Sequence, residues 1–253
     1  MSRGKPVVAE LWRYPVKSLR GERLEAVSLD GRGIVGDRAF AICDTTGKLG
    51  SGKTTRRFRL IRGLFEFRAE TDADGVVVHG PDGMCVRVGD RELDALLTAR
   101  YGKPLAVRQE EAVPHFDAGA VHLLTTSSLR WVEARYGHTG GDARRYRPNI
   151  ILDTSGAGLM EQRWLGATLS IGSCAVRVIA TVERCVMTNN AQDDLPQDDG
   201  VLRFLSRENQ AMLGVYADVV VPGEIRVGDL VTVASDQGPS RALRLLKRSD
   251  HRG

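Results

Sequence analysis

The sequence predicts a mainly β protein of the α+β class, built as β-barrel domains with a few covering helices. Short apolar segments rich in β-branched residues recur along the 253 residues and are separated by Gly, Asp and Pro. Helical patterns are few, and they do not alternate with strands as they would in a doubly wound sheet. A polar, proline-containing stretch at residues 110–119 is suited to link two lobes. These observations favour barrel architecture in two parts.

The predicted strands run through the whole chain. Each is a short apolar run bounded by turn-forming residues. In chain order they cover residues 7–14, 24–29, 38–43, 76–79, 85–88, 105–108, 122–125, 150–153, 168–171, 175–180, 219–221, 225–227 and 230–233. Gly172 and Ser173 predict a tight hairpin between two of these strands, and Pro222 with Gly223 predicts a second turn.

Three helices are predicted to cover the strands, at residues 92–101, 127–136 and 201–213. The first two stop at Gly102 and Gly137, because glycine readily adopts the left-handed conformation that ends a helix. The third follows Asp198 and Asp199, whose charges suit a helix start, and it stops before Gly214.

Domain organisation and composition limit the classes of function. We expect an N-terminal β-barrel-like domain over residues 5–109, a second domain over residues 110–235, and a basic, disordered tail at residues 236–253. The chain is 42% hydrophobic and 27% charged, which is ordinary for a globular protein. Its formal net charge of +4 comes largely from the tail, and no aromatic-rich basic stripe accompanies it. No stretch resembles a signal peptide or a membrane helix. We therefore expect a cytoplasmic protein that binds neither nucleic acid nor membrane.

Cys185 is the most informative cysteine. It ends an apolar run beside Arg184, whose charge favours the thiolate that attacks electrophiles or binds a soft metal. A free cysteine is more often a small buried hydrophobe, and that interpretation is kept for Cys43, Cys85 and Cys174. Since the sequence has no Cys-x-x-Cys pair, we expect neither a zinc ribbon nor an iron–sulfur site, and a reducing compartment fits.

A glycine-rich segment imitates a nucleotide-binding motif. The run from Gly47 to Thr54 satisfies the phosphate-loop pattern GxxxxGK[ST] and follows a predicted strand. Such a loop needs a helix directly after it, so that backbone N–H groups face the phosphates. Residues 54–63 are a short candidate for that helix, and alternating strands and helices are missing around them. A nucleotide triphosphatase is therefore the weakest alternative, although this basic loop can still touch an anion.

Two short polar segments near the N-terminus suit an anionic group. Lys17 and Ser18 follow a predicted strand and offer a point charge and a hydroxyl donor, although a surface lysine is the simpler explanation. Arg38 opens another strand beside Asp37. It forms either a simple ion pair with that aspartate or a planar fork for an anion.

Two further segments lie in the second half. Four hydroxyls meet at the start of the second predicted helix, from Thr125, Thr126, Ser127 and Ser128. They suit an anion at the helix N-terminus, and they equally suit plain N-capping. In the sequence Arg147-Pro148-Asn149, the proline favours an extended Arg147, so that its guanidinium and the Asn149 amide point to the same side of a strand. Arg144 and Arg145, just before, are expected in solvent.

Together and in this order, these segments resemble the MOSC family, which is named for the C-terminal part of molybdenum cofactor sulfurases. The resemblance covers roughly residues 7–233 and is closest to the two-lobed branch with an N-terminal MOSC β-barrel domain, which includes the mitochondrial amidoxime-reducing component and bacterial relatives. Its markers are Tyr14-Pro15-Val16-Lys17-Ser18, Gly36-Asp37-Arg38, Arg147-Pro148-Asn149-Ile150, Arg184-Cys185-Val186-Met187-Thr188 and Gly223-Glu224-Ile225-Arg226-Val227-Gly228-Asp229.

The resemblance implies a molybdenum cofactor, in which a pterin dithiolene holds the metal. It implies that Cys185 is the molybdenum ligand and the catalytic residue. It also implies a cofactor-binding set of Lys17, Ser18, Arg38, Thr126, Ser127, Ser128, Arg147 and Asn149. The residue types agree, because a soft thiolate suits molybdenum–sulfur coordination and several cations and N–H donors suit a phosphate. Pyridoxal phosphate binding is not expected.

The activity implied by the resemblance is that of a molybdenum-dependent oxidoreductase. It would reduce small N-hydroxylated or N-oxide-type substrates with electrons from a separate reductase, because the sequence shows no flavin or iron–sulfur module. A carrier of the cofactor or of sulfur, without turnover, is the alternative. The chain departs from the family pattern at residues 188–196, where an acid-and-proline loop is typical, and this loop is expected to border the substrate. It also departs at residues 50–53, which we expect to lie over the cofactor.

Overall fold

The computed structural model describes residues 4–234, so the tail predicted at residues 236–253 lies outside the described residues. The strands are β1 (Val7–Arg13), β2 (Val16–Lys17), β3 (Glu22–Leu24), β4 (Ala26–Asp30), β5 (Gly33–Ile34), β6 (Phe40–Asp44), β7 (Leu49–Ser51), β8 (Phe58–Leu60), β9 (Arg68–Asp72), β10 (Gly75–His79), β11 (Cys85–Arg87), β12 (Leu105–Gln109), β13 (Val121–Thr125), β14 (Ile150–Asp153), β15 (Thr168–Ile171), β16 (Cys174–Glu183), β17 (Met212–Val221), β18 (Gly223–Arg226) and β19 (Val231–Ala234). The α-helices are α1 (Arg91–Tyr101), α2 (Thr126–Tyr136), α3 (His138–Gly141) and α4 (Gly200–Asn209). The predicted strand-rich α+β class is confirmed.

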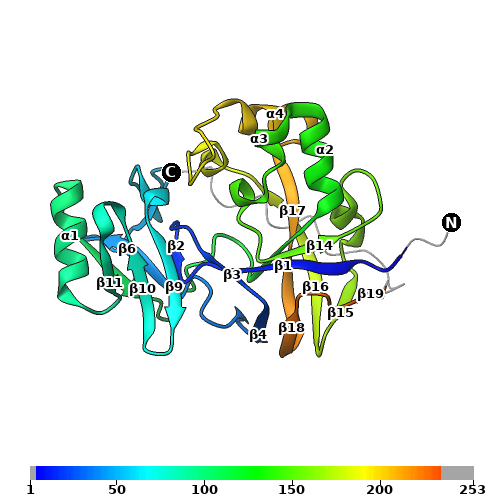
Figure 1. Ribbon diagram of the computed structural model, residues 1–253, viewed down its shortest axis with the longest axis horizontal. Helices are drawn as coiled ribbons and strands as arrows, with labels where there is room; N and C mark the ends of the chain where they lie inside the picture. The colour runs from blue at the N-terminus through cyan, green and yellow to red at the C-terminus, as the bar shows by residue number, and fades with distance from the viewer. Residues whose placement is uncertain (1–3, 235–253) are drawn as a thin grey trace.

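The first lobe lies at the left of Figure 1 and holds two small sheets covered by α1. One sheet has the order β12-β6-β7-β8 with β2 beside β6, and the other has the order β11-β10-β9. Leu93 and Leu97 on one face of α1 are buried in the core of this lobe. The helix also covers the outer edge of β12, because Asp94 accepts the Val107 N–H at 2.8 Å and Thr98 accepts the Leu105 N–H at 3.1 Å.

The second lobe is built on an eight-stranded sheet with the order β19-β15-β16-β17-β13-β14-β1-β3. Alternate residues of its strands form a separate core, as the burial of Val176 and Val178 along β16 and of Val215 and Ala217 along β17 illustrates. Within residues 4–234 the sheet does not close into a barrel by strand pairing. The two ends of the sheet nevertheless meet, because Val8 exchanges backbone hydrogen bonds with Gly228 and Asp229, and the Val231 N–H donates to the Pro6 carbonyl at 2.8 Å. The predicted β-barrel is therefore present as a sheet whose ends are joined by a few hydrogen bonds and not by a full strand ladder.

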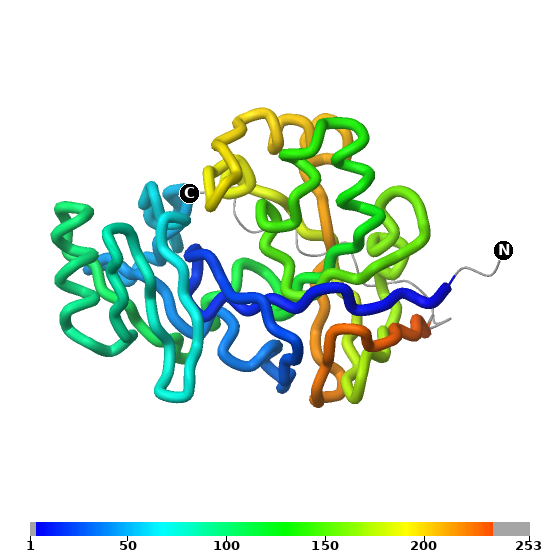
Figure 2. Tube along the Cα trace, viewed as in Figure 1, coloured from blue at the N-terminus to red at the C-terminus, as the bar shows by residue number. Residues whose placement is uncertain are grey.

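The two lobes do not follow the order of the sequence. The N-terminal strand β1 pairs with β14 and β3, and β4 pairs with β18, so most of the first thirty or so residues are built into the second lobe, whereas β2 between them pairs with β6 of the first lobe. Figure 2 shows this dark blue trace running across the molecule before the chain turns into the first lobe. Consequently residues 14–38 pass through the junction between the lobes. The predicted boundary between residues 109 and 110 stays a prediction.

One predicted helix is too long. Residues 201–213 were expected to be helical, but α4 ends at Asn209 and β17 starts at Met212. Gln210 and Ala211 both adopt left-handed backbone conformations, with φ of 52° and 61°, and so turn the chain sharply. Pairing of the following apolar residues with β16 outweighs their helical spacing. The helices predicted at residues 92–101 and 127–136 and the hairpin at Gly172 are confirmed.

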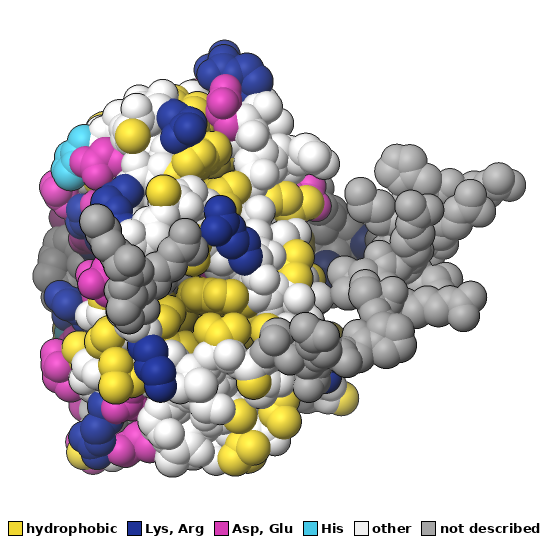
Figure 3. Space-filling model, turned by 90° about the vertical axis from the view of Figure 1, so that its right-hand side faces the viewer, with side chains coloured by type: hydrophobic (Ala, Val, Ile, Leu, Met, Phe, Trp, Pro, Cys, Tyr) yellow, Lys and Arg dark blue, Asp and Glu magenta, His cyan; other side chains and the backbone are white. Residues whose placement is uncertain are grey.

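The face at the right of Figure 1 carries hydrophobic side chains near its middle (Figure 3). Near β19, an apolar cavity of about 350 Å³ is lined by residues that include Pro6, Trp164 and Val231. None of the predicted site residues is among the described residues around it. Among residues 4–234, no helix has the length and apolar character needed to cross a bilayer.

Candidate functional site

Most of the predicted site residues meet in one pocket at the junction between the lobes. Those that line it are Lys17, Ser18, Arg38, Arg147, Asn149 and Cys185. The cavity volume is about 80 Å³. Ligand pockets usually measure about 300–1,000 Å³, so a large ligand requires wall side chains to move. The walls come from segments more than a hundred residues apart in the sequence, which explains why no local motif defines the pocket.

Three of these residues have left-handed backbone conformations. The φ angles are 65° at Ser18, 52° at Arg38 and 53° at Arg147. Such conformations are strained for residues other than glycine, by about 1–3 kcal/mol each, and they cluster at ligand sites. The finding corrects the prediction that Pro148 holds Arg147 extended. Arg147 instead ends the 3₁₀ helix Ala143–Tyr146, and its N–H donates to the Ala143 carbonyl at 3.2 Å.

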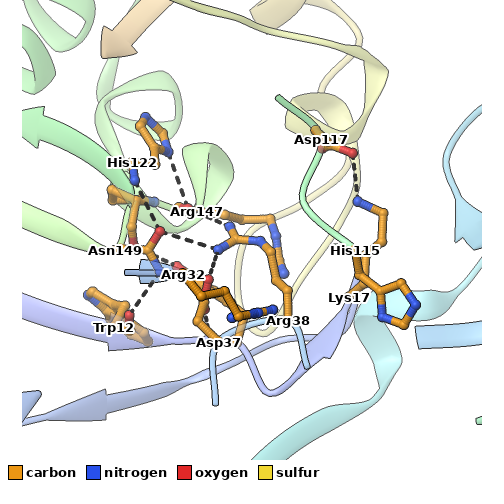
Figure 4. A network of polar contacts seen from close by, with 12 residues as sticks. Trp12, Lys17, Arg32, Asp37, Arg38, His115, Asp117, His122, Arg147 and Asn149 are labelled. Atoms are coloured by element: carbon orange, nitrogen blue, oxygen red, sulfur yellow. Dashed lines mark hydrogen bonds and ion pairs between the residues drawn. The ribbon is translucent and has the colours of Figure 1, made fainter. Parts of the chain in front are cut away.

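Arg38 belongs to a buried polar network (Figure 4). It forms an ion pair with the fully buried Asp37, and its Nη1 donates to Asn149 Oδ1 at 3.2 Å. Asn149 Oδ1 also accepts the His122 N–H at 3.1 Å, while its Nδ2 donates to the Trp12 carbonyl at 3.3 Å. Both ends of the Asn149 amide are thus bonded within the protein. The ion pair expected as one alternative for Arg38 is confirmed, and Asn149 positions the arginine.

Arg147 lies between aromatic rings with part of its guanidinium unbonded. Its guanidinium carbon is 4.1 Å from the Tyr14 ring centroid and 5.3 Å from that of Phe65, and Nη1 donates to the Leu19 carbonyl at 2.6 Å. Nη2 has no hydrogen-bond partner among the protein atoms of residues 4–234. Burial lowers the pKa of Arg147 to about 10. A half-buried guanidinium with a buried, unpaired donor is stabilised by an anion.

Lys17 and Ser18 form the opposite wall. Lys17 is only 4% exposed, and its ammonium donates to Asp117 Oδ1 at 2.6 Å and lies 5.1 Å from the Phe58 ring centroid (Figure 4). Burial lowers the pKa of Lys17, and Asp117 opposes that shift. Ser18 Oγ donates to the Gly50 carbonyl at 2.9 Å. The expectation of a surface lysine is wrong, because β2 pairs with β6 and places Lys17 inside the junction.

Cys185 is the only cysteine among the described residues that line the pocket. It is half-buried and directly precedes the 3₁₀ helix Val186–Asn189, and its carbonyl accepts both the N–H and the hydroxyl of Thr188 at 3.0 Å. In the described part of the chain, no three His, Cys, Asp or Glu side chains are grouped so that they could hold a metal. A metal at Cys185 therefore has to bring its other ligands with it.

Arg145 fixes the loop that follows the cysteine. It was expected in solvent, but it is fully buried. Its guanidinium donates to the carbonyls of Thr139 at 2.7 Å, Thr188 at 3.2 Å and Pro196 at 2.8 Å. The prediction failed because this loop supplies carbonyl acceptors from forty or more residues away. Arg145 thus holds residues 188–196 against the body of the second lobe.

The hydroxyls at the start of α2 are not brought to the cysteine. Among the described residues that line the pocket, Thr126, Ser127 and Ser128 do not occur. Thr126 Oγ1 donates to Asp153 Oδ1 at 2.7 Å, and Ser128 Oγ donates to the buried Glu161 at 2.5 Å. Thr125 accepts the Ser128 N–H, so the N-capping alternative is confirmed. Cofactor binding by these hydroxyls remains a prediction without geometric support.

The glycine-rich segment does not form a phosphate loop. It contains β7, and the described residues 52–60 continue through turns into β8 without a helix. The backbone N–H groups that a nucleotide phosphate needs are therefore not gathered there. Ser51 lines the cysteine pocket, and a Cβ on Gly52 would lie 2.6 Å from Met187 Sδ. This loop packs directly against the segment that carries Cys185.

His122 also lines the pocket, and sequence reasoning missed it. Its ring nitrogen Nδ1 lies 3.3 Å from the Arg147 carbonyl, and an added Cβ on Gly214 would lie 2.3 Å from its Nε2. Burial, Arg184 and Arg38 hold the pKa of His122 well below 6.5, so the ring is neutral. The pattern of the sequence gave no signal for it, because its partners are distant in the chain.

This histidine predicts an acid-sensitive stability. Because its pKa is lower in the folded than in the unfolded chain, its contribution is complete above pH 6.5 and is lost as the pH falls below that value. We expect the free energy of unfolding in urea to decrease between pH 6.5 and 5, and to decrease less in His122→Gln. Burial also lowers the pKa of His115. This second histidine accounts for part of the pH dependence of stability that remains in the variant. An unchanged slope in the variant would contradict the assignment.

Two profiles of known protein families together match nearly the whole described chain. The profile of the MOSC domain matches residues 102–232, and that of the MOSC N-terminal beta barrel domain matches residues 5–116. No curated protein matches the sequence.

Solved structures provide a likeness of fold. The YUAD protein from Bacillus subtilis is 13% identical over 92% of this chain and 97% of its own, with a TM-score of 0.51. YiiM from Escherichia coli is 12% identical over 93% of this chain and 71% of its own, with a TM-score of 0.42. YiiM from Geobacillus stearothermophilus is 21% identical over 46% and 55%, with a TM-score of 0.35. At these identities the likeness to the Bacillus subtilis protein concerns the fold alone.

Proposed function

The chain belongs to the MOSC family, and on that premise we propose that it is an oxidoreductase that binds a molybdenum–pterin cofactor at Cys185. One observation carries the proposal. A single half-buried cysteine shares a pocket with the buried Lys17 and the half-buried Arg38 and Arg147. A soft ligand beside several hard cationic donors suits a group that is a thiophilic metal at one end and a phosphate at the other.

The donor set of the pocket fits this cofactor. One thiolate is too few to hold a metal ion alone, whereas a dithiolene brings two sulfur ligands of its own. Lys17 offers an ammonium that its pairing with Asp117 only partly satisfies, and the guanidinium of Arg147 lines the same pocket. The Asp117 side chain is 60% exposed, so it is free to swing away when a phosphate replaces it. That movement enlarges a cavity that is narrow in its present form.

In the proposed mechanism each residue has a separate task. Lys17, Ser18 and Arg38 bind the phosphate, Arg147 binds and orients the pterin side, and Cys185 ligates the metal. Asn149 keeps Arg38 in place, since its amide is bonded within the protein. When bound, the cofactor supplies the two-electron chemistry that removes the oxygen of an N-hydroxylated compound and releases water after uptake of two electrons and two protons. A separate reductase delivers the electrons.

Cofactor content and turnover test the proposal together. We would produce the protein in a cofactor-competent host and measure molybdenum by elemental mass spectrometry and oxidised pterin by fluorescence. Turnover of an N-hydroxylated benzamidine would be followed with reduced methyl viologen as the electron donor. We expect near-stoichiometric molybdenum and pterin, with reduction to the benzamidine. Tight cofactor binding without reduction of any N-hydroxylated compound would identify a carrier instead, and protein that never acquires pterin would refute both.

A further inference from the structure

Arg147 also lines a second cavity, which has no role in the proposed mechanism. This cavity has a volume of about 270 Å³ and is bordered by Trp12 and Tyr14 of the N-terminal segment and by the loop after Cys185. Among the described residues that line it, the charged ones are Arg20, Arg23, Arg68, Arg144, Arg147 and Asp193. Its walls thus carry five cations and one acid. Such an excess of one sign focuses an attractive potential for anions.

Three of the five arginines are paired with acids outside the cavity. Arg23 lies 3.9 Å from Glu10, Arg68 lies 2.5 Å from Glu70, and Arg144 lies 2.8 Å from Asp142. The other two differ. Arg20 pairs with Asp193 inside the cavity, and no ion pair joins Arg147 to an acid within residues 4–234. Burial, and to a smaller extent the charge of Arg68, lower the pKa of Arg20.

Buried donors around this cavity have no protein acceptor. Within residues 4–234, Arg20 Nε, Arg147 Nη2 and Gln192 Nε2 lack a hydrogen-bond partner. Gln192 is only 5% exposed. Buried polar groups are nearly always bonded, and an arginine can only donate. The group that satisfies these three side chains is therefore rich in acceptor oxygens.

Asp193 resembles an internal substitute for such a group. Its carboxylate contacts Arg20 and lies 3.7 Å from Arg144. Its backbone has a left-handed conformation, with φ of 49°. Asp193 lies on the loop that follows Cys185, and its side chain is 41% exposed. A strained, half-exposed acid is easily displaced from a cationic cavity by a better acceptor.

We propose that this cavity is a binding site for an oxyanion, namely the carboxylate or phosphate group of a small molecule, which displaces Asp193. Arg20, Arg147 and Gln192 donate to it. Binding of the anion does not require the proposed function. The inference that this site selects substrates with an acidic group does rest on that function. The shared Arg147 would then place the acidic end of the substrate beside the cofactor pocket.

The test is calorimetric titration of the cofactor-loaded protein with inorganic phosphate, and separately with acetate, at constant ionic strength. The bound cofactor fills the phosphate site at Lys17, so that the measured heat comes from binding in the second cavity. We expect Asp193→Asn to bind the anion about tenfold more tightly, because one competing charge is removed. Gln192→Glu should bind at least about tenfold more weakly, because it adds a fixed carboxylate. The relative affinity for phosphate and acetate tells which acidic group the site prefers.

Asp194→Asn is the matched control. It removes the same charge from a neighbouring, 79% exposed side chain that bonds Arg144 at 2.7 Å without lining the cavity in the described chain. Its affinity should stay within about twofold of wild type. Equal effects of Asp193→Asn and Asp194→Asn, or no response to Gln192→Glu, would overturn the proposal. If pterin is never acquired, the same titration in Lys17→Gln still decides the anion site, so its failure is separable from failure of the proposed function.

Discussion

Replacement of Cys185 by serine is expected to abolish turnover while the protein keeps its fold and its pterin. The cysteine is the only thiol among the described residues that line the pocket, and a serine oxygen is a poor substitute for a thiolate. We expect reduction of N-hydroxylated compounds to decrease by at least about 100-fold, the upper end of what loss of a supporting residue costs a metal site. The measurement is steady-state turnover together with molybdenum and pterin content.

The fold should tolerate this substitution. Cys185 is half-buried, and the contacts that anchor it use its backbone carbonyl, which accepts from Thr188. The cations that bind the phosphate are unchanged, so pterin should remain near wild type. Cys85→Ser is the matched control, because that thiol is exposed in the first lobe, and its prediction as a buried thiol is therefore wrong. Wild-type turnover and unchanged metal–sulfur coordination, by X-ray absorption, in Cys185→Ser would refute the ligand assignment.

Much of the fold could be predicted because its strands carry their own signal. Runs such as Val121–Thr125 and Ile150–Asp153 are apolar and β-branched, and their strands were expected. Strands of two or three residues, such as Leu49–Ser51, were missed because so short a run carries no pattern of apolar residues, even though its partners β6 and β8 are near in the sequence. The helix predicted through residue 213 failed for a different reason. Its last residues satisfy a helical spacing, but the partner strand Cys174–Glu183 extends them.

The site residues likewise divide into those that the sequence predicted and those that it did not. Lys17, Arg38 and Arg147 were predicted to act together, and the structure brings them to one pocket with Cys185. The prediction rested on the order of these segments along the chain, since each segment alone is equally explained by an ordinary structural role such as an ion pair. Arg145 was misassigned, because what buries an arginine is the supply of distant carbonyl acceptors, which composition does not reveal. Unpaired donors such as those of Arg20 are likewise visible only in three dimensions.

Glu161 is expected to give the largest change in stability. It is fully buried, and it accepts from Thr125 Oγ1 at 2.6 Å, Ser128 Oγ at 2.5 Å and the Gly214 N–H at 3.2 Å. Glu161→Leu leaves these three donors buried without an acceptor, at about 1–3 kcal/mol for each. We therefore expect the free energy of unfolding to decrease by at least about 3 kcal/mol. Urea denaturation followed by circular dichroism measures this loss.

The variant Glu161→Gln separates the charge of this residue from its hydrogen bonds. Burial raises the pKa of Glu161 above 4.5, so the stability that its proton confers is present below pH 4.5 and is lost as the pH rises through the folded pKa. Glutamine stays neutral and keeps an acceptor oxygen. The difference in unfolding free energy between Glu161→Gln and wild type should therefore shift in favour of the variant from pH 5 to pH 8.

The pterin content of Glu161→Gln should be unchanged, because the hydroxyls that Glu161 binds cap α2 and do not line the cysteine pocket in the described chain. A variant that folds normally but loses pterin would show instead that the start of α2 belongs to the cofactor site.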